Sequence, residues 1–346
     1  MPEVSVVIVC MNRPDLLFPC LDSLRAHTSV PFETLVVAYR FSADNLKELV
    51  TRYPWVEVIP SLEIRGFSEN NNLALKHVKG RYCFILNDDT LLEMPVIDRL
   101  VADMEALPAS AAALSPCIRF ADGRIQTCGR APWTARRYAR HYLHLVDEGK
   151  EASWGDSVRL AHSGPSHRFR HPLRELVSGG SCPQPLSVGG QAPQNPSSSH
   201  SGMFQTYTLN GACFLIKTEV FREAGWFDER FFFTPEDIAL GHKLNDMGYT
   251  VWADPSVSIT HLAGGSVSAM EPAIKPARVR GSLIFYGEPL WLRCFIGCFE
   301  ALRVVKYAFL PATEHNQLMA RTARNVLRTV FSKASPKELF IRFSQS

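Results

Sequence analysis

The sequence has no strong excess of charge of either sign. Its 346 residues carry 37 Lys and Arg against 34 Asp and Glu, a net charge of +3, which is too small to indicate a nucleic-acid-binding protein. The nine cysteines form no CxxC pair, so neither a zinc site nor a thiol-redox motif is indicated. Because Cys10 and Cys83 lie within apolar runs, we expect buried, reduced thiols of a cytoplasmic protein.

Long apolar runs are also missing. No stretch approaches the ~20 apolar residues that a membrane-spanning helix needs, and the nearest one, 291–310, contains four charged residues. The N-terminal residues include an acid, Glu3, where a secretory signal would be basic. We therefore expect a cytoplasmic protein that at most touches the inner face of the membrane.

The first 115 residues alternate short β-rich runs with helical patterns. This order predicts an α/β fold, with a doubly wound, mostly parallel sheet and helices on both faces. Ligands of such folds bind beyond the carboxyl ends of the strands. The expected strands are 4–10, 33–38, 56–59 and 82–86, and the expected helices are 16–27, 43–53, 70–78 and 95–107.

The pattern then breaks over an insertion, 134–206. Within it, 178–202 holds seven Ser, five Gly and four Pro, a composition that predicts a flexible loop. Further on we expect a short helix at 217–224, a helix at 237–247 that Gly248 stops, and two strands, 250–253 and 257–261. The catalytic domain is expected over 1–265.

The remaining residues, 266–346, are expected to form amphipathic helices. The aromatic and aliphatic residues expected near one face are Trp291, Phe295, Phe299, Leu302 and Phe309. Basic residues accompany them at Arg293, Arg303 and Lys306. Such a face fits an interfacial helix on an anionic membrane, and it fits equally well a helix that packs on the catalytic domain or on another subunit.

An acidic cluster follows the apolar run 82–86. Asn87, Asp88 and Asp89 offer oxygen ligands at the end of a predicted strand, and Mg²⁺ or Mn²⁺ binds such oxygens together with substrate phosphates. The alternative is a polar turn that caps a helix.

A second acidic cluster, Glu236 and Asp237, opens the predicted helix 237–247. An ionised Asp can accept the proton of an attacking hydroxyl. The alternative is an ordinary helix start, since acids favour the positive end of the helix dipole.

Two further features carry weaker signals. His261 ends a predicted strand and could complete a Mn²⁺ site or be a structural histidine. The loop 66–72 opens a helix, so it could bind phosphate or serve as an Asn cap. The Asp122-Gly123-Arg124 sequence predicts a hairpin turn.

Together these segments resemble the family-2 inverting glycosyltransferases of GT-A fold, in particular their bacterial rhamnosyltransferase-like branch. They follow the family's order over roughly residues 4 to 265, and each is weak alone but specific in combination. The matching segments are Val4–Val9 with Asn12–Arg13, Gly66–Asn72, Leu86–Thr90, Asp122–Gln126, Leu209–Ala212, Gly225–Glu229, Glu236–Asp237, Gly248–Tyr249 and His261.

The resemblance implies a role for each matched position. Asp237 corresponds to the general base, with Glu236 beside it in the acceptor site. Asp89 corresponds to the main metal ligand, with Asn87 and His261 completing the site. The residues implied to hold the nucleotide are Asn12, Arg13, Gly66, Phe67, Asn71, Asn87 and Asp88.

The sequence departs from the family in three places. One is the insertion, which over 134–202 is long for this branch, and the other two are single positions. Ala38-Tyr39-Arg40 stands where an Asp usually reads the nucleotide base, and Ala239 stands where a second Asp often follows Asp237.

We therefore expect a metal-dependent inverting glycosyltransferase. Its donor would be a dTDP- or UDP-sugar, and its acceptor a saccharide or a lipid-linked saccharide of surface polysaccharide biosynthesis. The alternatives are a catalytically inactive sugar- or nucleotide-binding protein on the same fold, for which Ala38 is the best argument, and a sugar nucleotidyltransferase. The Gly-rich, basic signature of the latter is absent near the first strand.

Overall fold

The computed structural model describes residues 1–143, 202–262 and 269–345. The predicted flexible loop 178–202 lies outside the described residues except for Gly202. The strands are β1 (Val4–Cys10), β2 (Phe32–Tyr39), β3 (Val56–Ser61), β4 (Tyr82–Asn87), β5 (Thr90–Leu91), β6 (Ala111–Phe120), β7 (Ile125–Thr127), β8 (Phe204–Thr206), β9 (Cys213–Lys217) and β10 (Thr250–His261).

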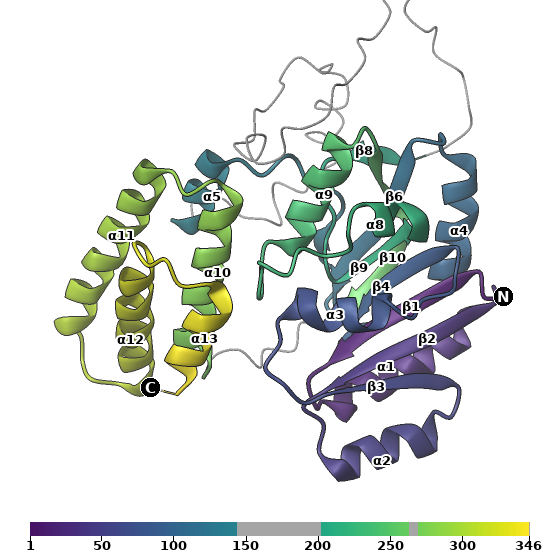
Figure 1. The fold of residues 1–346 in the computed structure, drawn as a ribbon, viewed down its shortest axis with the longest axis horizontal. Coiled ribbons are helices and arrows are strands. Elements are labelled where there is room, and N and C mark those ends of the chain that lie inside the picture. Colours follow the sequence, from purple (N-terminus) through teal and green to yellow (C-terminus); the bar gives the residue numbers. More distant parts are fainter. Residues whose placement is uncertain (144–201, 263–268, 346) are drawn as a thin grey trace, which may run out of the picture.

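Helices cover the sheet and continue beyond it (Figure 1). They are α1 (Pro14–Ala26), α2 (Ala43–Arg52), α3 (Phe67–Leu75), α4 (Val96–Ala106), α5 (Ala135–Tyr142), α8 (Thr218–Glu223), α9 (Glu236–Asp246), α10 (Glu271–Phe285), α11 (Leu290–Ala308), α12 (Glu314–Thr329) and α13 (Pro336–Ser344).

One sheet runs through the molecule in the order β3-β2-β1-β4-β9-β6-β10-β5. Its first four strands are parallel, as the βαβα order predicts. β9 runs antiparallel to both β4 and β6, because the chain re-enters the sheet at the carboxyl end of β4, where Leu86 pairs with Cys213. The carboxyl ends of β1 and β4 lie side by side, with Val9 opposite Asn87.

Alternate residues of each strand feed two cores, because side chains of a strand alternate between the two faces of the sheet. Val4, Val6 and Ile8 of β1 belong to the core beneath α1 and α4. Val7 of the same strand belongs to the core beneath α3, α8 and α9, together with Phe214. The prediction of helices on both faces is confirmed.

β10 corrects one prediction, that of two separate strands at 250–253 and 257–261. A single strand spans both, with a register shift against β6 between Asp254 and Ser258. The Asp254 carboxylate accepts hydrogen bonds from Ser256 N and Oγ, both at 2.7 Å. The polar groups of the bulge therefore bond to each other, and the pairing of β10 with β6 resumes at Ser258.

The C-terminal helices α10 to α13 form a bundle beside the sheet, with α11 at its outer edge (Figure 1). Its core contains Val279, Leu283, Leu292, Ile296 and Val326, and Ala139 of α5 joins them. None of the described helices is both long and apolar enough to cross a bilayer.

The bundle covers only part of the apolar face that the sequence predicts on α11. Phe295 packs against the bundle core, and the ring of Phe299 meets Tyr142 edge-on at 5.7 Å. Trp291, Leu302 and Phe309 are 48%, 69% and 86% exposed. The helix thus has apolar residues on two faces, of which the bundle covers one.

Candidate active site

The two acidic clusters meet through the loop that precedes β9. Asn87, the last residue of β4, donates its N–H to Ala212 O at 2.9 Å. The neighbouring Gly211 donates its N–H to Asp237 Oδ2 at 3.0 Å. Clusters far apart in the sequence therefore lie one short loop from each other, at the carboxyl edge of the parallel strands, where open α/β sheets bind ligands.

Asp237 lies in the first turn of α9, so the helix-start interpretation is confirmed. The carboxylate is oriented by three donors: Oδ2 accepts from Gly211 N and, at 3.5 Å, from Arg130 Nη1, and Oδ1 accepts from Ile238 N at 2.7 Å. Its side chain is 14% exposed. The guanidinium and the N–H groups compensate the negative charge, so the group is held as an oriented carboxylate that solvent or a ligand can still reach.

Arg130 is a site residue that sequence reasoning missed. Its backbone is fixed to β8, because Arg130 N donates to Thr206 Oγ1 at 2.7 Å and Tyr207 N donates to Arg130 O at 3.1 Å. No local pattern marks it, since the partner carboxylate of Asp237 is 107 positions away in the sequence.

Glu236, the neighbour of Asp237, is a buried acid. It is 6% exposed, and its Oε2 has no hydrogen-bond partner among the residues that the structure describes. Burial raises the pKa of Glu236 to about 8, and the negative charge of Asp237 adds to the rise. The side chain is therefore neutral at pH 7, and its implied place in the acceptor site stays a prediction.

Replacing Glu236 with Gln is expected to stabilise the protein at pH 8 and to change little at pH 5. The folded-state pKa, about 8, lies above the unfolded value, so folding loses about 1.4 kcal/mol per pH unit between the two values. Gln has no such penalty. Melting temperatures across pH 5–8 measure the effect, with Glu314→Gln, on the exposed start of α12, as the control. An equal shift at both pH values would contradict the burial argument.

Asp89 and His261 form the second part of the site. His261 Nε2 lies 3.0 Å from Asp89 Oδ1, and His261 Nδ1 lies 2.8 Å from Gln126 Oε1. Backbone pairing fixes the two residues, because His261 pairs with Thr90 and Leu262 N donates to Asp89 O at 2.8 Å. Nothing in the sequence indicates that Gln126 would bond to His261.

The donor atoms of Asp89 and His261 fit a divalent cation. With the Nδ1 proton directed at Gln126, Nε2 and the carboxylate are both acceptors, and a proton or a cation must lie between them. Neighbouring ligands of an octahedral Mg²⁺ are about 2.9 Å apart for bonds of about 2.0–2.1 Å, close to the observed 3.0 Å. Residues 1–143, 202–262 and 269–345 contain no cluster of three or more His, Cys, Asp or Glu that could hold a metal, so substrate phosphates would have to complete the coordination.

Asp88 and Asn87 occupy the end of β4. Burial raises the pKa of Asp88 to about 6, the Cys10 thiol opposes the rise, and the charge of Asp89 adds to it. The backbone carbonyl of Asn87 accepts a hydrogen bond from the Thr90 hydroxyl at 2.7 Å, across the turn between β4 and β5. The alternative of a turn that caps a helix is wrong, because a short strand, β5, follows instead.

The residues after β1 lie at the same edge. Asn12 has a left-handed backbone with φ of 51°, and its Oδ1 accepts from Ser42 N at 3.0 Å and Asn45 Nδ2 at 2.9 Å. Arg13 pairs with Asp15 at 2.7 Å. Both side chains have partners within the protein, and their contact with a nucleotide stays a prediction.

The loop before α3 is built around a glycine. Phe67 N donates to Phe232 O at 2.9 Å, and a Cβ on Gly66 would collide with that same oxygen. The side chain of Glu69, not of an Asn, caps the helix by accepting from Gly66 N at 3.0 Å, so the Asn-cap alternative is wrong. Asn71 is buried inside α3 and donates to Phe67 O at 2.9 Å.

A cavity of about 990 Å³ lies elsewhere, between α9, residues 224–231 and the end of α10. It is lined by Ala239 and Lys243 of α9, which a helical turn of 100° per residue places on the side opposite Asp237. None of the predicted site residues lines it, so we assign the active site to the carboxyl edge of the sheet.

The fold is that of the GT-A glycosyltransferases. A solved structure titled "Crystal structure of GalNAc-T7 with UDP, GalNAc and Mn2+" superimposes with a TM-score of 0.54 and 15% identity, over 99% of this chain and 56% of that one. At that identity the likeness shows the fold alone.

The chain belongs to glycosyltransferase family 2. The family model described as "Glycosyl transferase family 2" matches residues 5–154. The chain is 30% identical over 296 residues to an N-acetylglucosaminyl-diphospho-decaprenol L-rhamnosyltransferase of Mycobacterium tuberculosis, covering 82% of this chain and 84% of that protein.

A second relative is much longer than this chain. The O-antigen biosynthesis protein RfbC of Myxococcus xanthus is 25% identical over 264 residues, which are 75% of this chain and 17% of that protein. The predicted family, fold and enzyme class are confirmed, and the sugar nucleotidyltransferase alternative is wrong.

Proposed function

We propose that this enzyme moves a sugar, with inversion, from a nucleoside-diphosphate sugar to a hydroxyl of a saccharide or lipid-linked acceptor in surface polysaccharide biosynthesis. The observation that carries the proposal is that one short loop links the two acidic clusters: Ala212 O accepts from the N–H of Asn87, and Gly211 N donates to Asp237. A cation-binding pair and a carboxylate base are what a single displacement at an anomeric carbon requires.

Asp237 is the proposed general base. Its oriented carboxylate accepts the proton of the acceptor hydroxyl as that oxygen attacks the anomeric carbon. One displacement inverts the configuration and needs no protein nucleophile, and the transition state resembles an oxocarbenium ion, as in glycoside hydrolysis. Arg130 and the N–H of Gly211 hold the carboxylate of the base in place.

Asp89 and His261, with Asn87, are the proposed holders of Mg²⁺ or Mn²⁺. A cation held there would supply positive charge against the diphosphate of the leaving nucleotide. Asn87 and Asp88, the loop before α3, and the Asn12–Arg13 turn surround the same edge and are proposed to bind the nucleotide. The proposed donor is a dTDP- or UDP-sugar. The mycobacterial relative is named as an L-rhamnosyltransferase of N-acetylglucosaminyl-diphospho-decaprenol, which supports a lipid-linked acceptor.

A screen tests this function directly. Purified protein with Mn²⁺ is incubated with UDP-, dTDP- and GDP-sugars, and thermal stabilisation and donor hydrolysis are measured. One nucleotide class should stabilise the protein, and EDTA should abolish the effect. Failure of every nucleotide sugar to bind or turn over would favour the remaining alternative, a catalytically inactive protein on the same fold.

We also propose peripheral contact with an anionic membrane, through one face of α11. Its exposed residues recur every three or four positions, which places them along one side of a helix. Residues 290–346 carry nine Lys and Arg against three Asp and Glu, so the bundle has the charge that an anionic surface attracts. The exposed face consists of Trp291, Cys294, Cys298, Leu302, Val305 and Phe309.

The basic residues expected to meet headgroups need correction. Arg303 donates two bonds of 3.0 Å to the buried carboxylate of Glu300, and Arg293 pairs with Glu288. Both side chains face the protein: Arg303 because the buried carboxylate of Glu300 demands paired cations, and Arg293 because it pairs with Glu288. Lys306 remains exposed and keeps its predicted role.

Leu302→Asp is expected to reduce binding to vesicles with anionic lipid by about tenfold or more, because it removes buried apolar area and adds a repelled charge. Leu62→Asp, at a residue 75% exposed on the sheet domain, is the matched control and should bind normally. Co-sedimentation at low and high salt measures both variants. Equal binding of Leu302→Asp and wild type would refute the proposal that this face of α11 contacts the membrane.

A further inference from the structure

We propose that α13 is part of the catalytic apparatus, with Lys337 and Phe340 as positioning residues. Lys337 fixes the loop before α3, and Phe340 fixes the segment that leads to Asp237. The inference rests on the proposed function, since it assigns the first segment to the donor and the second to the base.

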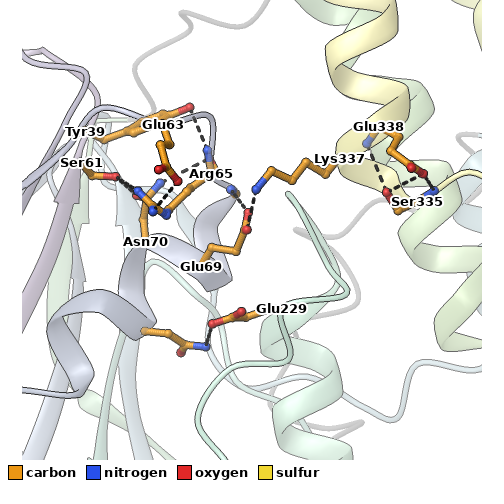
Figure 2. Close-up of polar contacts among 12 residues, drawn as sticks. Tyr39, Ser61, Glu63, Arg65, Glu69, Asn70, Glu229, Ser335, Lys337 and Glu338 are labelled. Carbon is orange, nitrogen blue, oxygen red and sulfur yellow. Dashed lines mark hydrogen bonds and ion pairs between the residues drawn. The ribbon is translucent and has the colours of Figure 1, made fainter.

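Lys337 reaches across from the bundle to the sheet domain. Its Nζ lies 2.7 Å from Glu69 Oε1 (Figure 2), while Glu69 Oε2 accepts from Gly66 N at 3.0 Å. One carboxylate therefore joins α13 to the first turn of α3. Because Lys337 is 38% and Glu69 20% exposed, the pair is worth little to global stability, and its main effect is on the placement of the loop.

Phe340, one turn further along α13, packs on two rings of the segment before α9. Its ring centroid lies 4.9 Å from Phe232 and 5.2 Å from Phe233. Phe232 is 2% exposed, and only Thr234 and Pro235 separate Phe233 from the acids of α9. Displacement of these rings would shift the start of α9, and with it the Asp237 carboxylate.

The two contacts act on one unit, because the segments that they hold are bonded to each other. Phe67 N donates to Phe232 O at 2.9 Å, and Gly66 packs on the same carbonyl. On another side, Gly281 of α10 lies so close to Thr234 O that a Cβ there would collide. The segment 231–235 is thus held between α3, α10 and α13.

α13 is itself firmly anchored, so it can act as a brace. Leu339 and Phe343 form a small core with Ala273 of α10, and Arg280 Nε donates to Ala334 O at 2.9 Å. Ser335 and Glu338 cap its first turn reciprocally (Figure 2). Lys337 projects from the anchored helix toward α3, and Phe340 lies between this small core and the rings of Phe232 and Phe233.

The two positions should separate kinetically. Lys337→Ala is expected to raise the KM for the donor up to about fivefold with little change in kcat, because a partly exposed ion pair contributes only a small free energy. Lys337→Arg should restore the wild-type KM. Phe340→Ala is expected to lower kcat about tenfold to 100-fold, since a catalytic group displaced by about 1 Å can slow the reaction by that factor. Lys333→Ala and Phe331→Ala, at exposed positions just before α13, are the matched controls and should behave as wild type.

All variants are assayed in the full chain below their melting temperatures, with Asp237→Asn alongside. Wild-type KM and kcat in both α13 variants, with Asp237→Asn inactive, would overturn the role of α13 and leave the proposed function standing. Full activity of Asp237→Asn would overturn the proposed base instead. A donor KM that Lys337→Arg fails to restore would also overturn the positioning role of the ion pair.

Discussion

Replacing Asp237 with Asn is expected to lower kcat by about 10²–10⁴-fold, the usual contribution of a general base, while donor affinity stays nearly unchanged. The base is used only when the acceptor attacks, so the donor complex does not depend on its charge. Asn keeps the size of the side chain and can still accept from Gly211 N, which now bonds Oδ2 at 3.0 Å. Turnover and donor titration on the same preparation measure both quantities.

Asp246→Asn, at the other end of α9 and exposed, is the matched control for that variant and should retain its turnover. Wild-type turnover in Asp237→Asn would remove the base assignment. A large loss of donor affinity would instead mean that Asp237 contacts the donor.

Asp89→Ala is expected to abolish the dependence of nucleotide affinity on Mn²⁺. The carboxylate and His261 Nε2, 3.0 Å apart, are assigned to the cation together with Asn87, so loss of Asp89 removes the main protein ligand. Calorimetry of nucleotide binding with Mn²⁺ and with EDTA measures the change. Asp22→Ala, at a side chain 55% exposed, is the control.

The metal hypothesis has a clear negative outcome. If wild-type affinity for the nucleotide is the same with Mn²⁺ and with EDTA, Asp89 and His261 form a hydrogen-bonded pair without a cation. Asp89→Ala would then act through the orientation of His261 alone.

The parts of the fold that the sequence predicts are those with a local cause. The run Tyr82–Leu86 is apolar because its strand is buried on both faces, and the polar residues after it mark the edge of the sheet. Gly248 ends α9 with φ of 88°, which glycine adopts without strain. Asp122-Gly123-Arg124 forms the predicted turn between β6 and β7, with φ of 82° at Gly123.

The parts that sequence reasoning missed depend on contacts between distant residues. Gln126 lies on β7 and Arg130 follows that strand, and the roles of both appear only when β8, α9 and β10 are in place. Lys337 and Glu69 are 268 positions apart, and although Glu69 lies in the matched segment 66–72, nothing in the sequence pairs it with Lys337. Individual charged residues of this kind are indistinguishable in sequence from ordinary surface charges.

The C-terminal helices show the same limit of sequence-based prediction, here for a whole face of α11. Periodicity predicts that α11 is amphipathic, but it does not say which apolar side chains the bundle covers. Tyr142 of α5, within the insertion, meets Phe299 and bonds Glu300 at 2.5 Å. That contact turns one apolar side inward and leaves Leu302 and Phe309 outside.

The stereochemistry of transfer tests the central claim most directly. Wild-type enzyme with Mn²⁺, the nucleotide sugar that binds best and a lipid-diphosphate-linked sugar acceptor should yield a single new glycosidic bond, whose anomeric configuration NMR reads from the coupling constants of the product. Single displacement by a hydroxyl that Asp237 deprotonates predicts the configuration opposite to that of the donor. Retention of the donor's configuration would contradict the account, because it requires an intermediate for which the site has no assigned nucleophile.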